Sequence, residues 1–243
     1  MNETLIERLR RAGSIAVLTG AGVSAESGIP TFRDAQTGLW ARYDPQELAT
    51  PEAFRRNPRL VWEWYEHRRA LVAAAAPNPA HLALVALERR LADFTLITQN
   101  VDGLHRRAGS QNVVELHGNI TRTTCFDEDV VIDRWPTTDA VPPRCPRCGG
   151  LLRPDVVWFG EALPPAAWEL ASAAARRCDV FLCVGTSGVV WPAADLPIQA
   201  RRSGAYVVEI NLAPGALHGR LDAHLYGPAG RLLPELVAVV AAV

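Results

Sequence analysis

The first residues suited to chemistry form a glycine-rich turn. The apolar, β-branched segment Ser14–Leu18 leads directly into the string TGAGVSAESGIPTFRD. In this string Gly20, Gly22 and Ala25 have the GxGxx(G/A) spacing of dinucleotide-binding turns, where glycine lets backbone amides approach a pyrophosphate closely. The spacing predicts phosphate binding, and the alternative is a glycine turn that only packs a strand against a helix.

Polar side chains follow two later apolar segments, at the positions where open α/β sheets bind their ligands. Gln99, Asn100 and Asp102 come directly after DFTLIT, and His117 follows VVEL. An imidazole titrates near neutral pH and suits a general base, while the amides and the carboxylate suit a pocket lining. Taken alone, Asn and Asp are also common in turns, and a single histidine is more often packed or solvated.

The segment VWEWYEHRRAL places Tyr65 and Arg68 three residues apart, so on a helix both side chains project from nearly the same face. A guanidinium binds a carboxylate through two hydrogen bonds, and a phenol adds a third. The pair therefore predicts recognition of a succinyl, malonyl or glutaryl end. The alternative is a solvated arginine-rich face, because His67 and Arg69 are neighbours.

Three of the five cysteines have the spacing of a metal site. Cys145 and Cys148 form a CxxC pair, and Cys125 is followed three residues later by Glu128, where a second pair would have a cysteine. Structural zinc takes four tetrahedral ligands, and a carboxylate oxygen of Glu128 or Asp127 is an acceptable fourth. The sequence predicts a structural zinc site of lowered affinity, or a lobe that folds without metal.

Alternating strands and helices must position these residues. Segments with apolar residues three and four apart lie between most of the β-branched segments, which is typical of a parallel α/β sheet. The predicted strands are 14–18, 94–98, 113–116, 180–184 and 205–210. The predicted helices are 3–12, 79–91, 165–177 and 232–242.

Two stretches interrupt this alternation. Residues 31–75 are rich in aromatic and charged side chains, and residues 119–153 hold prolines and three cysteines. We expect these insertions to form a smaller helical, zinc-ribbon-like lobe. Residues 1–30, 76–118 and 154–243 would then form a Rossmann-like α/β domain, with helices on both faces of a parallel sheet.

Composition limits the partners. With 25 Lys+Arg against 26 Asp+Glu, the formal charge of −1 provides no field that attracts nucleic acid or an anionic membrane surface. No apolar run reaches the roughly 18 residues that a membrane span needs. The odd number of cysteines favours reduced thiols over a disulfide framework. We expect a cytoplasmic protein, monomeric, with no nucleic-acid or membrane partner.

The string GAGVSAESGIPTFRD at 20–34 closely resembles the signature of the sirtuins, which are NAD-dependent protein deacylases. Similar motifs follow in order: TQNVDGLH at 98–105, ELHGN at 115–119, VVWFGE at 156–161, GTSGVVWPAA at 185–194 and EINL at 209–212. The resemblance spans nearly the entire chain. It implies that NAD and an acylated lysine bind in a cleft between a Rossmann-like domain and a smaller zinc-binding lobe. Glu128 departs from the family pattern, which has a cysteine there.

The resemblance also implies roles in a reaction that consumes NAD. The acyl-lysine carbonyl oxygen would displace nicotinamide, and His117, with Asn100 and Asp102, would form the catalytic set. His117 would activate a ribose hydroxyl, so that the acyl group passes to ADP-ribose and lysine leaves deacylated. The implied NAD-binding residues are Gly20, Ala21, Gly22, Ser24, Ala25, Thr31, Phe32, Arg33, Gln99, Asn100, Asp102, His117, Gly185, Thr186, Ser187, Asn211, Leu212 and Ala229.

The passage QELATPEAFRRNPRLVWEWYEHRR looks like the desuccinylase and demalonylase branch of the sirtuins, whose YxxR pair matches Tyr65 and Arg68. Ala49 would leave room for a larger acyl group. The apolar residues Val156, Val157, Trp158, Phe159 and Gly160 are predicted to form an extended segment that lines the lysine tunnel and pairs with substrate backbone, or a buried strand, or both.

Three other functions remain open at this point. Some deacetylases resembling this branch carry the same Tyr and Arg pair, so the chain is also compatible with a lysine deacetylase. A non-catalytic sensor of NAD or ADP-ribose would need the glycine turn but not His117. A mono-ADP-ribosyltransferase would use the same activated ribose and pass it to a protein nucleophile.

Overall fold

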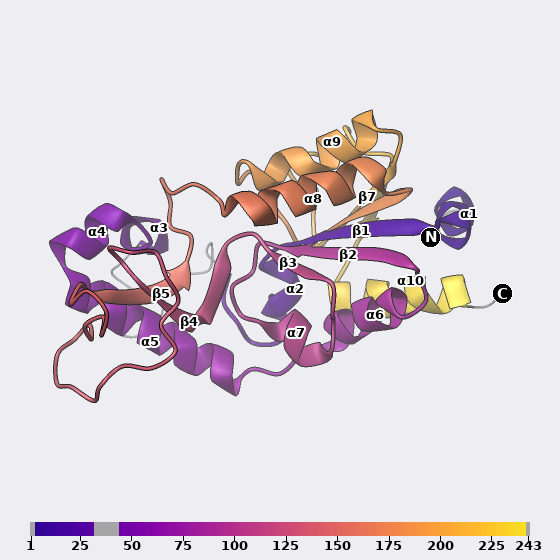
Figure 1. The fold of residues 1–243 in the computed structure, drawn as a ribbon. Helices are drawn as coiled ribbons and strands as arrows, with labels where there is room; N and C mark the ends of the chain where they lie inside the picture. Colours follow the sequence, from indigo (N-terminus) through magenta and orange to yellow (C-terminus); the bar gives the residue numbers. More distant parts are fainter. Residues whose placement is uncertain (1–2, 32–43, 242–243) are drawn as a thin grey trace.

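The computed structural model describes residues 3–31 and 44–241, and its larger part is a six-stranded sheet (Figure 1). The strand order is β3-β2-β1-β6-β7-β8, and every pairing is parallel. The carboxyl ends of all six strands therefore meet at one edge. The strands are β1 (Ser14–Thr19), β2 (Asp93–Thr98), β3 (Val113–Glu115), β6 (Val180–Val184), β7 (Tyr206–Asn211) and β8 (Ala223–Tyr226).

Helices cover both faces of the sheet, which confirms the predicted Rossmann-like fold (Figure 1). On one face Leu5, Leu84 and Leu233 pack against the sheet from three helices, α1 (Glu3–Arg11), α6 (Pro79–Glu88) and α10 (Ala229–Ala241). The other face is covered by α8 (Pro165–Arg177) and α9 (Leu196–Arg202), which pack against the sheet through small side chains such as Ala171 and Ala200. Because both faces are covered, β1 and β6 are buried almost throughout, as their unbroken apolar sequences require.

A smaller lobe combines the two predicted insertions (Figure 1). The first supplies α3 (Pro45–Leu48), α4 (Pro51–Arg56) and α5 (Pro58–Ala74). Each of these helices has proline in its first turn and begins after a capping side chain, from Asp44, Thr50 and Asn57 respectively. The second supplies the antiparallel strands β4 (Gly118–Cys125) and β5 (Leu152–Val156). Their shared core includes Phe54, Trp64, Tyr65 and Trp158.

The lobe differs from the sequence expectation at two boundaries, the first because Gly118, predicted to lie in the larger domain, begins β4. Residues 154–156 belong to β5 and pair with β4, whereas the predicted boundary after residue 153 would cut this strand. The reason is a long-range backbone pairing that local composition does not reveal. No single described helix is long and apolar enough to span a membrane; α5 and α6 meet that length and composition only together, across a bend of 71°.

Candidate active site

The carboxyl ends of the central strands bring the predicted loops together. β1 and β6 are neighbours in the sheet, so the loops that follow them meet where the strand order reverses. The Gln99 side-chain amide, after β2, donates to Thr186 Oγ1 at 2.9 Å. The Asn211 amide, at the end of β7, donates to the carbonyl oxygen of the same threonine at 2.9 Å. Thr186 therefore links residues from both halves of the sheet.

Glycines let the loops after β1 and β6 pack backbone against backbone. The Gly22 amide donates to the Gly185 carbonyl oxygen at 2.9 Å, and a Cβ on Gly20 would lie 2.7 Å from that oxygen. Gly185 itself has a φ of +59°, and a Cβ there would lie 2.5 Å from the Val23 nitrogen. Any larger residue would push the loops apart. Packing, the alternative interpretation of the turn, thus explains part of its glycine content.

The same loops also present backbone donors. Within residues 3–31 and 44–241, the amides of Ala21, Thr186 and Ser187 donate to no protein acceptor. Amides at such glycine turns are the groups that bind phosphate oxygens. The donor set therefore fits the pyrophosphate of a dinucleotide, in addition to the packing role of the glycines.

A buried hydrogen-bond chain ties the glycine turn to the loop after β2. The Ser24 hydroxyl donates to Asp102 Oδ2 at 2.7 Å and accepts from the Asn100 side-chain amide at 3.1 Å. Asn100 also donates to the Gly20 carbonyl oxygen at 3.0 Å, and Asp102 accepts the Leu104 amide at 2.8 Å. Burial raises the pKa of the Asp102 carboxyl. These contacts hold the two predicted NAD-binding loops in a fixed relation.

His117 has the protonation pattern of a base. Its Nδ1 lies 2.9 Å from the Gln99 carbonyl oxygen, which can only accept, so Nδ1 carries the proton and Nε2 keeps its lone pair. Burial lowers the pKa of the imidazole, and the hydrogen bond to Gln99 offsets part of that effect. The ring is therefore neutral at neutral pH, with Nε2 available to accept a proton.

Tyr65 and Arg68 present a hydrogen-bond donor and a cation from one side of α5. Tyr65 is buried, and its hydroxyl oxygen accepts the Trp158 indole N–H at 2.9 Å, which leaves the phenol proton available to donate. Burial raises the pKa of Tyr65 to about 12, so the phenol stays protonated. Burial lowers the pKa of Arg68, an effect that the nearby Tyr65 and Asp102 oppose. Arg68 therefore lies within electrostatic reach of the loop after β2.

The segment 156–160 differs from its prediction. β5 ends at Val156 and Trp158 is buried, but Phe159 and Gly160 form a turn in which Phe159 is 43% exposed. The turn is possible because Gly160 has a φ of +89°, and because the Glu161 carboxylate accepts the Trp158 amide at 2.7 Å. The prediction of an extended segment across all five residues is therefore wrong at its last two positions.

Two backbone hydrogen bonds place this segment between the other predicted site residues. The Val157 amide donates to the His117 carbonyl oxygen at 3.0 Å, and the Phe159 amide donates to the Ala49 carbonyl oxygen at 2.9 Å. Ala49 is buried just after α3. The segment thus connects the histidine with the lobe that carries Tyr65 and Arg68.

The remaining predicted NAD-binding residues are more dispersed. Ala25 ends the short α2 (Gly22–Ala25), and Ala229 begins α10; the Glu26 carboxylate joins these two ends by accepting the Gly230 amide at 2.9 Å. Leu212 is 71% exposed. Thr31 is partly buried, and Phe32 and Arg33 lie outside the described residues.

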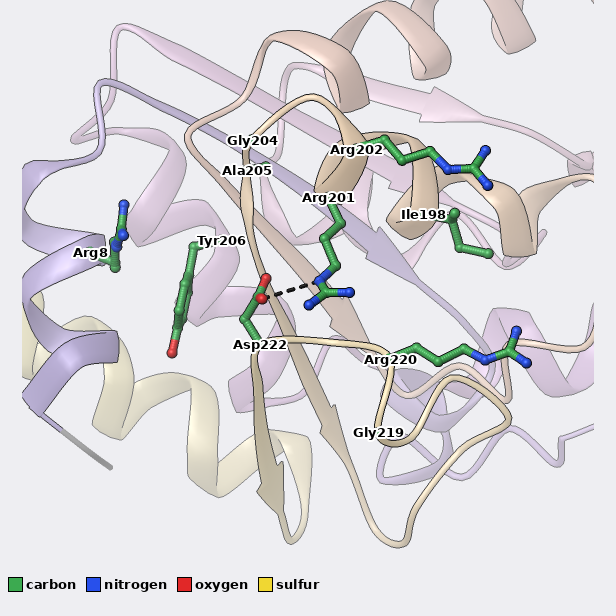
Figure 2. Close-up of a pocket in the computed structure, with 10 residues that line it drawn as sticks. All are labelled: Arg8, Ile198, Arg201, Arg202, Gly204, Ala205, Tyr206, Gly219, Arg220 and Asp222. Carbon is green, nitrogen blue, oxygen red and sulfur yellow. Dashed lines mark hydrogen bonds and ion pairs between the residues drawn. The ribbon is translucent and has the colours of Figure 1, made fainter.

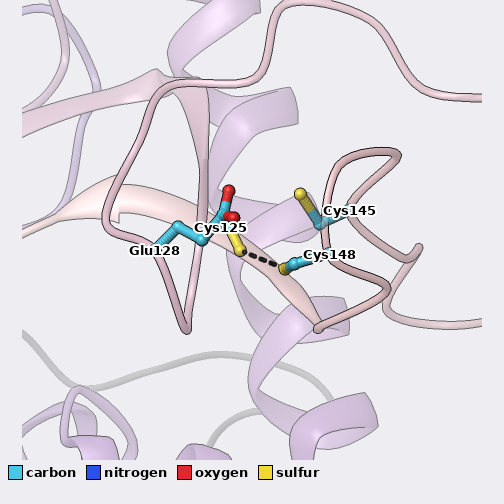
Figure 3. Close-up of side chains that lie close together, drawn as sticks. All are labelled: Cys125, Glu128, Cys145 and Cys148. Atoms are coloured by element: carbon cyan, nitrogen blue, oxygen red, sulfur yellow. Dashed lines mark hydrogen bonds between the residues drawn. The ribbon is translucent and has the colours of Figure 1, made fainter.

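The predicted metal ligands converge in the smaller lobe (Figure 3). One ligand atom each from Cys125, Glu128, Cys145 and Cys148 lies within 4.8 Å of the others, and the Cys125 and Cys148 sulfurs are 3.5 Å apart. Small side-chain rotations would bring such a set to tetrahedral zinc distances, so these residues fit the metal. Glu128 joins the cluster and also accepts a hydrogen bond from Arg147 at 3.0 Å.

A hollow of about 800 Å³ lies away from this chemistry (Figure 2). Its lining includes Tyr206, which begins β7, and Asp222, which precedes β8, so it sits at the amino-terminal edge of the sheet. Asp222 pairs with Arg201 at 3.2 Å, and three more arginines line the hollow: Arg8, Arg202 and Arg220. The predicted catalytic residues lie at the opposite edge, so this hollow is not their site.

Comparison with known proteins agrees with the geometry at the carboxyl edge. The family model described as the Sir2 family matches residues 20–192. This chain belongs to the Sir2 family. An NAD-dependent protein deacylase of Ralstonia nicotianae is 53% identical over 230 residues, which are 95% of this chain and 93% of the relative. NAD-dependent protein deacylase 2 of Pyrobaculum aerophilum is 55% identical over 224 residues, 92% of this chain and 90% of that protein.

Solved Sir2 structures match the whole fold. A Sir2 homologue crystallised in complex with NAD has a TM-score of 0.92 and 46% identity, covering 99% of this chain and 94% of that chain. A complex of Sir2 with a p53 peptide and NAD has a TM-score of 0.86 and 30% identity, covering 98% of each chain. The predicted family is therefore confirmed.

Two supports of this Sir2 family site were not predicted. Trp158 was assigned to the lysine tunnel, but its indole also holds the Tyr65 hydroxyl from 93 positions away. Arg153 lies over the Trp158 ring with its Cζ 3.4 Å from the centroid and forms two hydrogen bonds with the Glu161 carboxylate. No local spacing relates these residues, so only an observed co-variation of such pairs would have pointed to them.

Proposed function

We propose that this Sir2 family enzyme removes acidic acyl groups, succinyl or malonyl, from protein lysines while it consumes NAD. The coarser part, NAD-dependent protein deacylation, is the activity of the relatives that align over nearly the whole chain, and it is the activity of this chain. The finer part rests chiefly on one observation: Tyr65, whose hydroxyl is held by the Trp158 indole, and Arg68 lie three residues apart on α5.

The loops after β1 and β6 would hold NAD. NAD supplies the ribose carbon that receives the acyl oxygen when nicotinamide leaves, so the dinucleotide is a co-substrate. In this chain, the amides of Ala21, Thr186 and Ser187 are suited to its phosphates. Ser24, Asn100 and Asp102 would fix the position of the glycine turn against the nicotinamide end.

His117 would act as the general base. Its neutral ring presents Nε2, which can accept the proton of a ribose hydroxyl, while Nδ1–H stays bound to the Gln99 carbonyl oxygen. The Gln99 contact prevents the ring from turning its protonated nitrogen toward the substrate. The acyl C–N bond to lysine then breaks with the uptake of one water molecule and the acyl group passes to the ribose, so the products are deacylated lysine, nicotinamide and O-acyl-ADP-ribose.

Tyr65 and Arg68 would bind the far end of the acyl chain. A carboxylate can accept a hydrogen bond from the Tyr65 hydroxyl and pair with the Arg68 guanidinium, whereas an acetyl group ends in a methyl and has no second oxygen to bind there. Trp158 keeps the phenol oxygen in place, and burial keeps Tyr65 away from competing water. A structural zinc bound by Cys125, Glu128, Cys145 and Cys148 would stabilise the smaller lobe, which contains β4.

The test compares one lysine peptide carrying succinyl, malonyl or acetyl, with and without NAD. Mass spectrometry follows the peptide, nicotinamide and O-acyl-ADP-ribose together, and the variant His117→Tyr is the control for catalysis. We expect NAD-dependent loss of succinyl or malonyl to be faster than loss of acetyl. Faster loss of acetyl would keep the deacylase and refute the acidic preference.

Two further outcomes would overturn the catalytic part. If no acyl group is removed while NAD still binds, the chain acts as an NAD or ADP-ribose sensor. If ADP-ribose becomes attached to protein, the activated ribose is passed to a protein nucleophile, as in a mono-ADP-ribosyltransferase.

A further inference from the structure

A second group of metal-ligating side chains lies outside both the proposed active site and the cysteine cluster. Glu209 in β7 and His224 in β8 are direct partners in the register of the two strands, so their side chains are on the same face of the sheet. His218 reaches them from the turn that connects these strands. One ligand atom from each of the three residues lies within 4.8 Å of the others.

Glu209 provides a buried negative charge at the centre of this group. The residue is only 3% exposed. One carboxylate oxygen accepts the Gly215 amide at 2.9 Å, and the other lies 3.0 Å from His224 Nδ1. Across the described ranges, the only cationic partner within ion-pair distance is this histidine, with no arginine or lysine. A buried carboxylate with so little positive charge around it favours a bound cation.

The two histidines are already brought together. Their rings lie 4.6 Å apart between centroids, and the Tyr226 hydroxyl lies 2.6 Å from His218 Nδ1. A hydrogen bond to one ring nitrogen orients a histidine ligand, so Tyr226 can support His218 in that role. Since His218 is exposed, its ring can rotate to shorten the remaining distances without disturbing the core.

We propose that Glu209, His218 and His224 form a second metal site, for zinc or a divalent ion of similar preference. Two imidazoles and one carboxylate are ligands that zinc accepts, and tetrahedral zinc places such atoms about 3.3 Å apart at bond lengths of about 2.0–2.1 Å. The observed 3.0 Å between Glu209 and His224 is near that spacing. Three protein ligands leave a fourth position open to water.

This site connects to the NAD loops through the backbone. The Gly215 amide that binds Glu209 is followed by the Ala216 amide, which donates to the Ser187 carbonyl oxygen at 3.0 Å. Glu209 is also two residues before Asn211, which holds Thr186. A metal bound here would fasten the connection between β7 and β8 against the loop after β6.

Zinc content of the full chain tests the proposal directly. Native mass spectrometry after dialysis against zinc counts bound ions in the wild type, His218→Asn and His224→Asn, with His67→Asn as the matched control. All four proteins keep the cysteine cluster, so its contribution cancels. We expect the wild type and the His67 variant to bind one zinc more than the other two. Equal content in all four would overturn the proposal and leave the group as a hydrogen-bond network only.

A second measurement needs no variant and is unaffected by a folding defect. Diethyl pyrocarbonate modifies exposed imidazoles, and peptide mapping reports His218 and His67 in the same sample, both exposed. We expect added zinc to lower modification of His218 several-fold and to leave His67 unchanged. Unchanged modification of His218, or equal protection of both, would refute a specific site.

Discussion

Replacing Arg68 by methionine should remove the preference for a succinylated over an acetylated peptide. Methionine keeps an unbranched apolar side chain that can still pack against Trp64, whose ring centroid is 5.2 Å from Arg68 Cζ. It removes the cation and the fork of hydrogen bonds that a carboxylate would accept. Tyr65→Phe is a poorer probe, because it leaves the buried Trp158 indole N–H without its acceptor and destabilises the fold.

The size of the effect follows from the interaction removed. A hydrogen bond to a charged group contributes about 1.5–3 kcal/mol. At about 1.4 kcal/mol for each factor of ten, kcat/KM for a succinylated peptide should fall roughly 10- to 200-fold. An acetylated peptide makes no contact with this cation, so its kcat/KM should change less than about threefold. The ratio of the two values is therefore the quantity to measure.

The assay determines kcat/KM for both peptides at saturating NAD, in the wild type, Arg68→Met and Arg59→Met. Arg59 is a matched control, because it lies on the same helix and its side chain is exposed and paired with Glu63 at 2.7 Å. The control should leave both substrates unchanged. Equal loss toward succinyl and acetyl peptides in Arg68→Met would refute carboxylate recognition and assign Arg68 a structural role.

Buried histidines and the cysteine cluster carry three further predictions. Because burial lowers the pKa of His117, kcat/KM should stay level down to pH 6.5 and decline only below it; a decline that begins above the ordinary imidazole pKa would contradict a buried neutral base. Burial holds the pKa of His81 at about 4 and that of His105 at about 3, so the unfolded chain binds protons first as pH falls. The free energy of unfolding should therefore be independent of these two histidines above about pH 6.5. At pH 5 it should be lower than at neutral pH by roughly 2 kcal/mol for each of them. Urea titrations measure the loss of unfolding free energy between neutral pH and pH 5, and this loss should be smaller by about that amount in His81→Gln and in His105→Gln than in His67→Gln. An identical loss in all three variants would rule out this cause. Chelation of zinc, or Cys145→Ser, should lower Tm by several degrees if the cluster holds structural zinc, and a Tm that chelator leaves unchanged would show that the lobe folds without it.

Much of the site could be predicted because its chemistry is carried by local spacing. Parallel strands place their carboxyl ends at one edge, so side chains directly after apolar segments, such as Gln99 and His117, were expected to lie near the glycine turn. The CxxC pair likewise predicted that Cys145 and Cys148 would share a ligand cluster, and the structure brings Cys125 and Glu128 to it. Periodicity also predicted α8 at its observed bounds, Pro165–Arg177.

Other predictions failed where one residue overrides a pattern. The apolar run that ends at Phe159 has the composition of a strand, but Gly160 permits a positive φ and Glu161 closes the turn by accepting the Trp158 amide. At the glycine turn the sequence left phosphate binding and packing open as alternatives, and the close backbone contact between Gly22 and Gly185 shows that packing explains part of the glycine content. These outcomes depend on which distant segment becomes the neighbour.

The sequence by itself determined the kinds of group available and the edge of the sheet at which they gather, since strand direction and residue order are local properties of the chain. Only the tertiary structure decided what each group can do. The Gln99 carbonyl oxygen leaves His117 Nε2 free to act as a base, and Trp158 orients the phenol of Tyr65. The pairing of β7 with β8 places Glu209 beside His224. Protonation, orientation and metal geometry depend on contacts between residues far apart in the chain, and no local pattern encodes them.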